Sequence, residues 1–177
     1  MLYPIRICDF ILTAASRDML QRPIVSDTIL DEASRNIVAD RSDLTASQLK
    51  RRFDAVRRST DGHGMTVPLR FHDDALINAK DRHVVAAARF HKVDVIVSND
   101  KRLRREVNKW AAKHRSPLRT WSADELASEL RASSATGVVE VIAAMAARMT
   151  DPPRSADEVL GAMILSLPSL AGLAPPK

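Results

Sequence analysis

The sequence predicts an α/β protein in which a parallel sheet is flanked by helices and followed by a C-terminal helical extension. Short runs of β-branched residues alternate with longer segments in which apolar residues recur at helical spacing. The connections between these segments are short, which is typical of a parallel sheet covered by helices. After residue 121 the sequence becomes helical and Ala-rich. We therefore expect an α/β domain over residues 1–121 and a helical extension and tail over residues 122–177.

The first part of the chain is predicted to hold one short strand and three helices. Ile24 and Val25 suit a buried strand, and Pro23 excludes a helix at this point. Residues able to cap a helix precede two of the helical segments. The expected helices cover residues 5–20, begin at Ser26 or Asp27, and begin at Thr45 or Ser47. The sequence DGHG, residues 61–64, is expected to form a loop.

The clearest strand of the chain is VDVIV, residues 93–97, because four of its five residues are β-branched. It directly follows a helix expected over residues 81–91 and precedes a helix expected over residues 101–113. A second short strand is expected over residues 118–121. This order of helix, strand, helix and strand indicates a parallel sheet covered by helices.

The helical extension begins with a capping box, in which Ser122 and Glu125 satisfy each other's backbone groups. Its Ala-rich helix is expected to break at Asp151-Pro152-Pro153, and another helix follows. Two large aromatic residues, Trp110 and Trp121, are expected to anchor this extension.

Composition narrows the class of protein. With 177 residues the chain is long enough for one compact domain with an appended part. Cys8 is the single cysteine, so we expect a buried thiol and a reducing, cytoplasmic location without disulfides. No apolar run approaches the roughly 20 residues that cross a bilayer, so we expect no membrane partner. A net charge of +5 favours a polyanionic partner, while only seven aromatic residues argue against a base-stacking platform.

The pattern places two acidic residues where an α/β sheet binds its ligands, without fixing the distance between them, and a third acidic residue is a further candidate. Asp100 lies just past the predicted strand 93–97, Asp81 begins the preceding helix, and Glu32 lies one turn into an earlier helix. Carboxylates that converge at one sheet edge repel one another unless a cation neutralises them, and hard oxygen ligands suit Mg²⁺ or Mn²⁺. The alternative is that each carboxylate only caps or stabilises a helix N-terminus.

Three segments resemble the PIN-domain family. KDRHVVAAARFHKVDVIVSNDKRL, residues 80–103, resembles the second half of a PIN domain. SDTILDEASRNIV, residues 26–38, is similar to the helix that carries the family's conserved Glu, and LYPIRICDFILTAA, residues 2–15, resembles the stretch after the family's first strand. The helical sequence from Ser122 resembles that of a bacterial subgroup related to VapC-type toxins.

The resemblance implies a PIN-like fold and a metal-dependent ribonuclease. Glu32, Asp81 and Asp100 match three of the family's four acidic metal positions, and Ser98 matches a hydroxyl that often lies beside the last one. In that family these groups hold Mg²⁺ or Mn²⁺ for RNA cleavage. Its members are usually toxins that a cognate antitoxin holds in check, so we expect an RNA substrate and an antitoxin partner, with a homodimer possible.

The sequence departs from the family pattern at its beginning. In the family an Asp-x-Asn-Val motif ends the first strand and stands directly before the counterpart of Leu2, whereas this sequence starts at Met1. Asp9 does not replace the missing acid, because it lies about two helical turns further on. We expect either that the start was assigned too late, which we favour, or that the chain is a truncated, inactive descendant. Mass spectrometry of the native N-terminus distinguishes these.

A basic run follows Asp100. Its members could hold RNA phosphates beside the metal, or form an ordinary solvated helix face. The proposed RNA-binding residues are Lys101, Arg102, Arg104 and Arg105. A second basic cluster over residues 50–58 is expected to be solvated surface or a rim for RNA or antitoxin.

The sequence is also compatible with other functions. The main alternative is a decayed PIN-like module, without catalysis, that binds an antitoxin or RNA through its basic faces. A DNA-binding helical protein is a weaker alternative, because the sequence lacks a convincing helix-turn-helix pattern. His83 and His91 are eight residues apart, which does not suit a chelating pair on one helix, so structural roles are expected for both.

Overall fold

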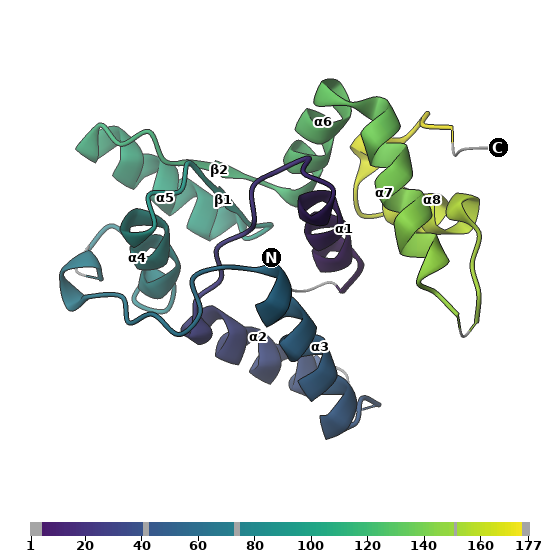
Figure 1. The fold of residues 1–177 in the computed structure, drawn as a ribbon. Helices are drawn as coiled ribbons and strands as arrows, with labels where there is room; N and C mark the ends of the chain where they lie inside the picture. Colours follow the sequence, from purple (N-terminus) through teal and green to yellow (C-terminus); the bar gives the residue numbers. More distant parts are fainter. Residues whose placement is uncertain (1–4, 41–42, 73–74, 151, 175–177) are drawn as a thin grey trace. The chain divides into compact units, whose positions relative to one another are not determined.

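The computed structural model describes residues 5–40, 43–72, 75–150 and 152–174. The chain divides into two compact units, Arg22–Trp121 and a second formed by Met1–Gln21 with Ser122–Lys177 (Figure 1). Over the described ranges the protein is α/β and mostly helical, with eight α-helices and one two-stranded parallel sheet. The predicted boundary after residue 121 coincides with the boundary between the units. Residues 5–21, which were expected in the α/β domain, belong to the helical unit.

The α/β unit contains most of the elements predicted around the carboxylates. They are α2 (Asp27–Asp40), α3 (Ala46–Ser59), the 3-10 turn η1 (Leu69–Phe71), α4 (Arg82–Phe90), β1 (Val95–Val97), α5 (Lys101–His114) and β2 (Arg119–Trp121). The two strands pair in parallel, with Ile96 opposite Thr120 at the centre. The carboxyl end of β1 leads through a short turn into α5, so the chain enters this helix at the edge of the sheet.

The strand predicted at Ile24 and Val25 is present only as an isolated bridge. Ile24 pairs in parallel with Asp61, and the backbone N–H of Val25 donates to the Asp61 carbonyl at 2.7 Å. Gly62, which follows Asp61, has a φ of +87°, and a Cβ here would lie 2.7 Å from the Ile24 side chain. The pairing therefore ends after one bridge, because the chain turns sharply at the DGHG loop.

The core of the α/β unit lies between α4, β1 and α5. Its buried members are Ile77, Val85, Ala88, Ile96, Leu103, Val107, Trp110, Ala111 and Leu118. Trp110 is 4% exposed, and the Arg89 guanidinium lies 5.0 Å from its ring centroid. The expectation that Trp110 anchors the helical extension was wrong, because its position on α5 places the ring in the core of the α/β unit.

The helical unit is formed by both ends of the chain. Its elements are α1 (Ile5–Ser16), α6 (Ala123–Ser133), α7 (Ala135–Ala147), α8 (Ala156–Ile164) and the 3-10 turn η2 (Pro168–Leu170). α7 packs against α1, α6 and α8 and buries Val138, Val141 and Ile142. Cys8 is buried on α1, as expected.

Polar contacts fix the ends of these helices. Ser122 and Glu125 form the predicted capping box at α6, and Ser155 forms a second one with Glu158 at α8. Arg131 on α6 donates to the carbonyls of Ser169 and Ala171, which holds the last part of the described chain against this helix. Local capping thus sets where these helices begin.

No single helix over the described residues has the length and apolar composition that crossing a membrane requires. The pair α6 and α7 meets that requirement only when the two helices are counted together across a bend of 120°. The start of the PIN-like segment, residues 2–4, lies outside the described residues, as does Asp151. Pro152 and Pro153 lie between the end of α7 at Ala147 and the start of α8 at Ala156, so the predicted break in the helical extension is confirmed for these two residues.

Candidate functional site

Asp100 stands directly before α5 and caps it. Its backbone is extended, with φ −70° and ψ +105°, and its Oδ1 accepts hydrogen bonds from the N–H groups of Arg102 at 2.7 Å and Leu103 at 3.0 Å. The Ser98 hydroxyl accepts from the Asp100 N–H at 3.1 Å, which fixes the turn between β1 and the helix. Ser98 and Asp100 therefore lie together at the carboxyl end of β1, as the sequence predicts.

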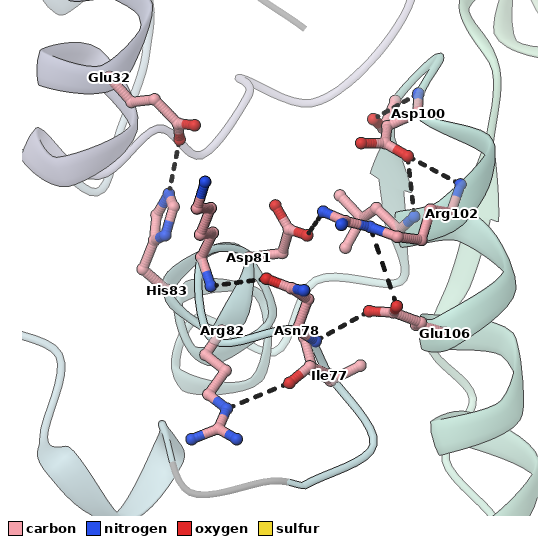
Figure 2. Close-up of polar contacts among 12 residues, drawn as sticks. Glu32, Ile77, Asn78, Asp81, Arg82, His83, Asp100, Arg102 and Glu106 are labelled. Atoms are coloured by element: carbon pink, nitrogen blue, oxygen red, sulfur yellow. Dashed lines mark hydrogen bonds and ion pairs between the residues drawn. The ribbon is translucent and has the colours of Figure 1, made fainter.

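Asp81 begins α4, but within the described structure its carboxylate does not cap that helix. The Arg102 Nη2 donates to Asp81 Oδ2 at 2.8 Å, and the Asp81 side chain is only 16% exposed. Asn78 holds the turn before it, because its carbonyl accepts from the Asp81 N–H and its Oδ1 accepts from the Lys80 N–H. The carboxylate thus faces α5 instead of its own helix (Figure 2).

Glu106 is a fourth acidic residue of this site, and sequence reasoning missed it. Its Oε1 lies 3.9 Å from Arg102 Nε, and its Oε2 accepts from the Asn78 N–H at 2.8 Å. The available signal was its spacing, because Glu106 stands four residues after Arg102 and therefore shares its face of the helix. Glu106 ties α5 to the turn that positions Asp81.

Glu32 reaches the same region from α2. Its Oε2 lies 3.2 Å from Nε2 of His83, at ion-pair distance, and the His83 side chain is 15% exposed. His83 stands two residues after Asp81 on the first turn of α4. Figure 2 shows Glu32 and His83 facing each other beside Asp81, with Asp100 on the other side of the Arg102 side chain.

The three predicted carboxylates lie in one region without forming a single cluster. In the described part of the chain no three His, Cys, Asp or Glu side chains are placed so that they could hold one metal ion. Asp81 faces a guanidinium, Asp100 faces main-chain N–H groups, and Glu32 faces an imidazole. Carboxylate oxygens are the hard ligands that Mg²⁺ and Mn²⁺ prefer, but the Asp81 carboxylate is already paired with the Arg102 guanidinium.

The basic run on α5 divides between two faces of the helix. An open groove of about 670 Å³ is lined by Lys101, Arg104, Arg105, Asn108, Lys109 and Ala112. These residues recur at spacings of three and four, so they share one side of α5. Arg102 instead turns to Asp81 and Glu106. The structure therefore places three of the four predicted RNA-binding residues together and assigns Arg102 to the acidic region.

A separate polar contact joins α2, α3 and the DGHG loop. Asp27 Oδ2 accepts from the Gly64 N–H at 2.6 Å, and Arg57 forms an ion pair with the same carboxylate. The pKa of Asp27 is lower than its ordinary value. The hydrogen bond from the Gly64 N–H is the largest cause, and the hydrogen bond from the Arg57 guanidinium is the next largest. Gly64 has a φ of +71°, which favours glycine at this point of the loop.

The chain matches no family model, no curated protein and no solved structure. No relative therefore supplies a substrate or a site residue for it.

Proposed function

We propose that the chain is a PIN-like ribonuclease that uses Mg²⁺ or Mn²⁺ and acts as the toxin of a toxin–antitoxin pair. One observation carries the proposal: the Asp81 carboxylate pairs with the Arg102 guanidinium and the Asp100 carboxylate accepts from the Arg102 main-chain N–H, so both carboxylates lie beside the first turn of α5. Two carboxylates at the edge of a sheet, beside a basic groove, suit the cleavage of a phosphodiester. A cytoplasmic location, a cognate antitoxin and a homodimer belong to the same proposal.

The residues that would hold the metal are Asp81, Asp100 and Glu32. When bound, Mg²⁺ or Mn²⁺ supplies Lewis-acid stabilisation and an activated water for in-line phosphoryl transfer. Neighbouring residues of the chain hold two of these carboxylates in position. Asp100 is held by the cap of α5 and by Ser98, and Asp81 is held by the turn at Asn78.

The RNA backbone would follow the groove on α5. Lys101, Arg105 and Lys109 are four residues apart, so they are separated by about 6 Å along the helix axis. Such a row of cations can contact successive phosphates without reading the bases, and it begins at the residue next to Asp100. This arrangement would deliver the RNA backbone to the acidic region.

Asp100→Asn tests the metal role of Asp100 without removing its structural role. Asn caps a helix about as well as Asp, so the free energy of unfolding should change by less than about 0.5 kcal/mol. Mg²⁺-dependent RNA cleavage should fall at least about a hundredfold, because a neutral amide is a poor ligand for this ion. The measurement is RNA cleavage against Mg²⁺ concentration, together with urea unfolding.

The matched control is Asp157→Asn, which changes an exposed acid in the first turn of α8 and should leave cleavage unchanged. Unchanged cleavage by the Asp100→Asn protein would contradict the proposed site.

A second candidate is a PIN-like module that binds RNA or an antitoxin without cleaving. It is favoured by the pairing of each carboxylate with a protein nitrogen in the described structure. RNA binding in EDTA, combined with no cleavage in either Mg²⁺ or Mn²⁺, would favour this module over the enzyme.

A further inference from the structure

We propose that Asn108 distinguishes RNA from DNA in the groove of α5, because its side-chain amide donates a hydrogen bond to the ribose 2′-hydroxyl of the bound strand. This inference rests on the proposed function, since it concerns the strand that the groove would hold, and it adds a residue that recognises the sugar. The cations of the groove contact phosphates, which RNA and DNA share, so they do not make this distinction.

The six residues that line the groove differ in their chemistry. Four of them are cations, one is Ala112, and Asn108 is the neutral hydrogen-bonding side chain among them. A neutral amide competes poorly with Lys and Arg for a phosphate, because hydrogen bonds between charged groups are stronger than those of neutral groups. Asn108 is therefore suited to a neutral acceptor of the bound strand.

The Asn108 amide is held in one orientation by the sheet. Asn108 is exposed on α5, and its Oδ1 accepts from the Thr120 hydroxyl at 3.0 Å. Thr120 is 7% exposed and pairs with Ile96 at the centre of the two strands. The two amide atoms diverge from one carbon, so Nδ2 is directed away from Thr120 and donates to a different side. A donor held in this way by a rigid element can select one acceptor of a ligand.

The position of Asn108 on the helix places it beside the row of cations. Lys101, Arg105 and Lys109 follow one another at four-residue spacing, and Asn108 stands three residues after Arg105, so it neighbours this row. The ribose is bonded directly to the phosphates that the row would contact, so the amide meets the sugar before it meets a base. In the described structure the residues that line the groove include no aromatic side chain on which a base could stack. The 2′-hydroxyl is the group of this sugar that DNA lacks.

The test compares the binding of the full chain to single strands of RNA and DNA that have one sequence, made only of A and C so that the bases are identical. Fluorescence anisotropy in EDTA measures both affinities without cleavage. The wild type should bind the RNA about fivefold more tightly than the DNA, as one additional hydrogen bond predicts. Asn108→Ala should bring this ratio below about twofold by weakening RNA binding alone. Its salt dependence should stay that of the wild type, because no charge is lost.

Matched variants separate the amide from its orientation and from charge. Thr120→Val keeps the shape of the buried side chain and removes the hydroxyl, so the ratio should fall as it does in Asn108→Ala, whereas Thr120→Ser should preserve it. Arg105→Ala should weaken the binding of RNA and DNA equally. The control is Asn36→Ala, which removes an exposed asparagine from α2 and should change neither affinity.

The possible results separate this inference from the proposed function. Equal affinities of the wild type for the two strands, or an equal loss of both affinities in Asn108→Ala, would overturn the role of Asn108. Mg²⁺-dependent cleavage of the same RNA, if it persisted, would then leave the ribonuclease proposal intact. Absence of RNA binding by the wild type would overturn both. A preference for RNA that appears with one order of A and C and not with another would indicate base reading and overturn the inference, whereas a preference lost in both Asn108→Ala and Thr120→Val would support it.

Discussion

At the scale of single residues, Asp81 and Asp100 show how the backbone decides what a carboxylate does. Both residues stand directly before a helix. A capping side chain can reach the N–H groups of its helix when its own backbone is extended, as it is at Asp100 with ψ +105°. Asp81 has φ −103° and ψ −4°, so its side chain points away from those groups and pairs with Arg102. The same residue type therefore caps α5 at Asp100 and connects α4 to α5 at Asp81.

The lowered pKa of Asp27 predicts a pH-dependent contribution to stability. Its ordinary pKa is 3.8, and the folded value is lower, so the stabilisation is present above pH 3.8 and is lost as the pH falls through the folded value. Asp27→Asn should reduce the free energy of unfolding near pH 7 by about 0.5–1 kcal/mol. The effect is small because the Asp27 side chain is 41% exposed, so solvent screens its ion pair with Arg57. The difference from wild type should shrink below pH 3.8.

Urea unfolding at several pH values measures this difference. Asp31→Asn, an exposed acid on the same helix, serves as the control. A deficit of the Asp27 variant that persists unchanged at low pH would show that the carboxylate charge is not its cause.

At the scale of elements, α5 combines three faces with different surroundings. Leu103, Val107 and Trp110 enter the core, Arg102 and Glu106 face the acidic region, and the remaining basic residues line the groove. A helix has 3.6 residues per turn, so residues three or four apart share a face while direct neighbours diverge. This geometry separates Arg102 from Lys101 although the two are adjacent in sequence.

The groove face of α5 should control how RNA binding depends on salt. Removing two cations with Arg105→Ala and Lys109→Ala should weaken binding and reduce the slope of log K against log salt by about 1.4, if each contacts one phosphate of a single strand. The measurement is fluorescence anisotropy with a labelled single-stranded RNA in EDTA at several salt concentrations.

A control with the same loss of charge is Arg51→Ala and Arg58→Ala on α3, both exposed. If this pair reduced the slope as much as the α5 pair, binding would reflect net charge instead of the groove.

At the scale of the whole molecule, the chain forms two compact units that each have a buried interior. Ile96 lies in the core of the α/β unit, and Ile142 is buried on α7 of the helical unit. The helical unit takes its elements from both ends of the chain, so the α/β unit is inserted between α1 and α6 in sequence. Neither unit corresponds to a simple N-terminal or C-terminal half.

Matched core substitutions should therefore act mainly within their own unit. Ile96→Ala and Ile142→Ala each remove the same buried groups and should cost about 2–5 kcal/mol. Hydrogen exchange resolved by residue should show faster exchange mainly in residues 22–121 for the first variant, and mainly in the helical unit for the second. Equal acceleration throughout the chain in both variants would mean that the two units unfold as one.

Sequence patterns predicted many of the helices, their caps and both strands of the sheet. The capping box at Ser122, the helix over residues 101–113 and the strand within residues 93–97 all have counterparts in the structure. The patterns did not predict that Ile24 and Val25 would pair at a single bridge, nor that Trp110 would enter the α/β core. Those outcomes depend on which distant segment lies beside each residue.

The sequence by itself determined the helix starts and the basic face of α5, because these depend on residues within four positions of one another. Only the tertiary structure decided the pairing of Arg102 with Asp81, of Glu32 with His83 and of Asp27 with Gly64. Each of these pairs joins residues more than twenty positions apart, and their distances are set by how the helices pack. The residue types of the acidic region were visible in the sequence, but the cation that lies among them was not.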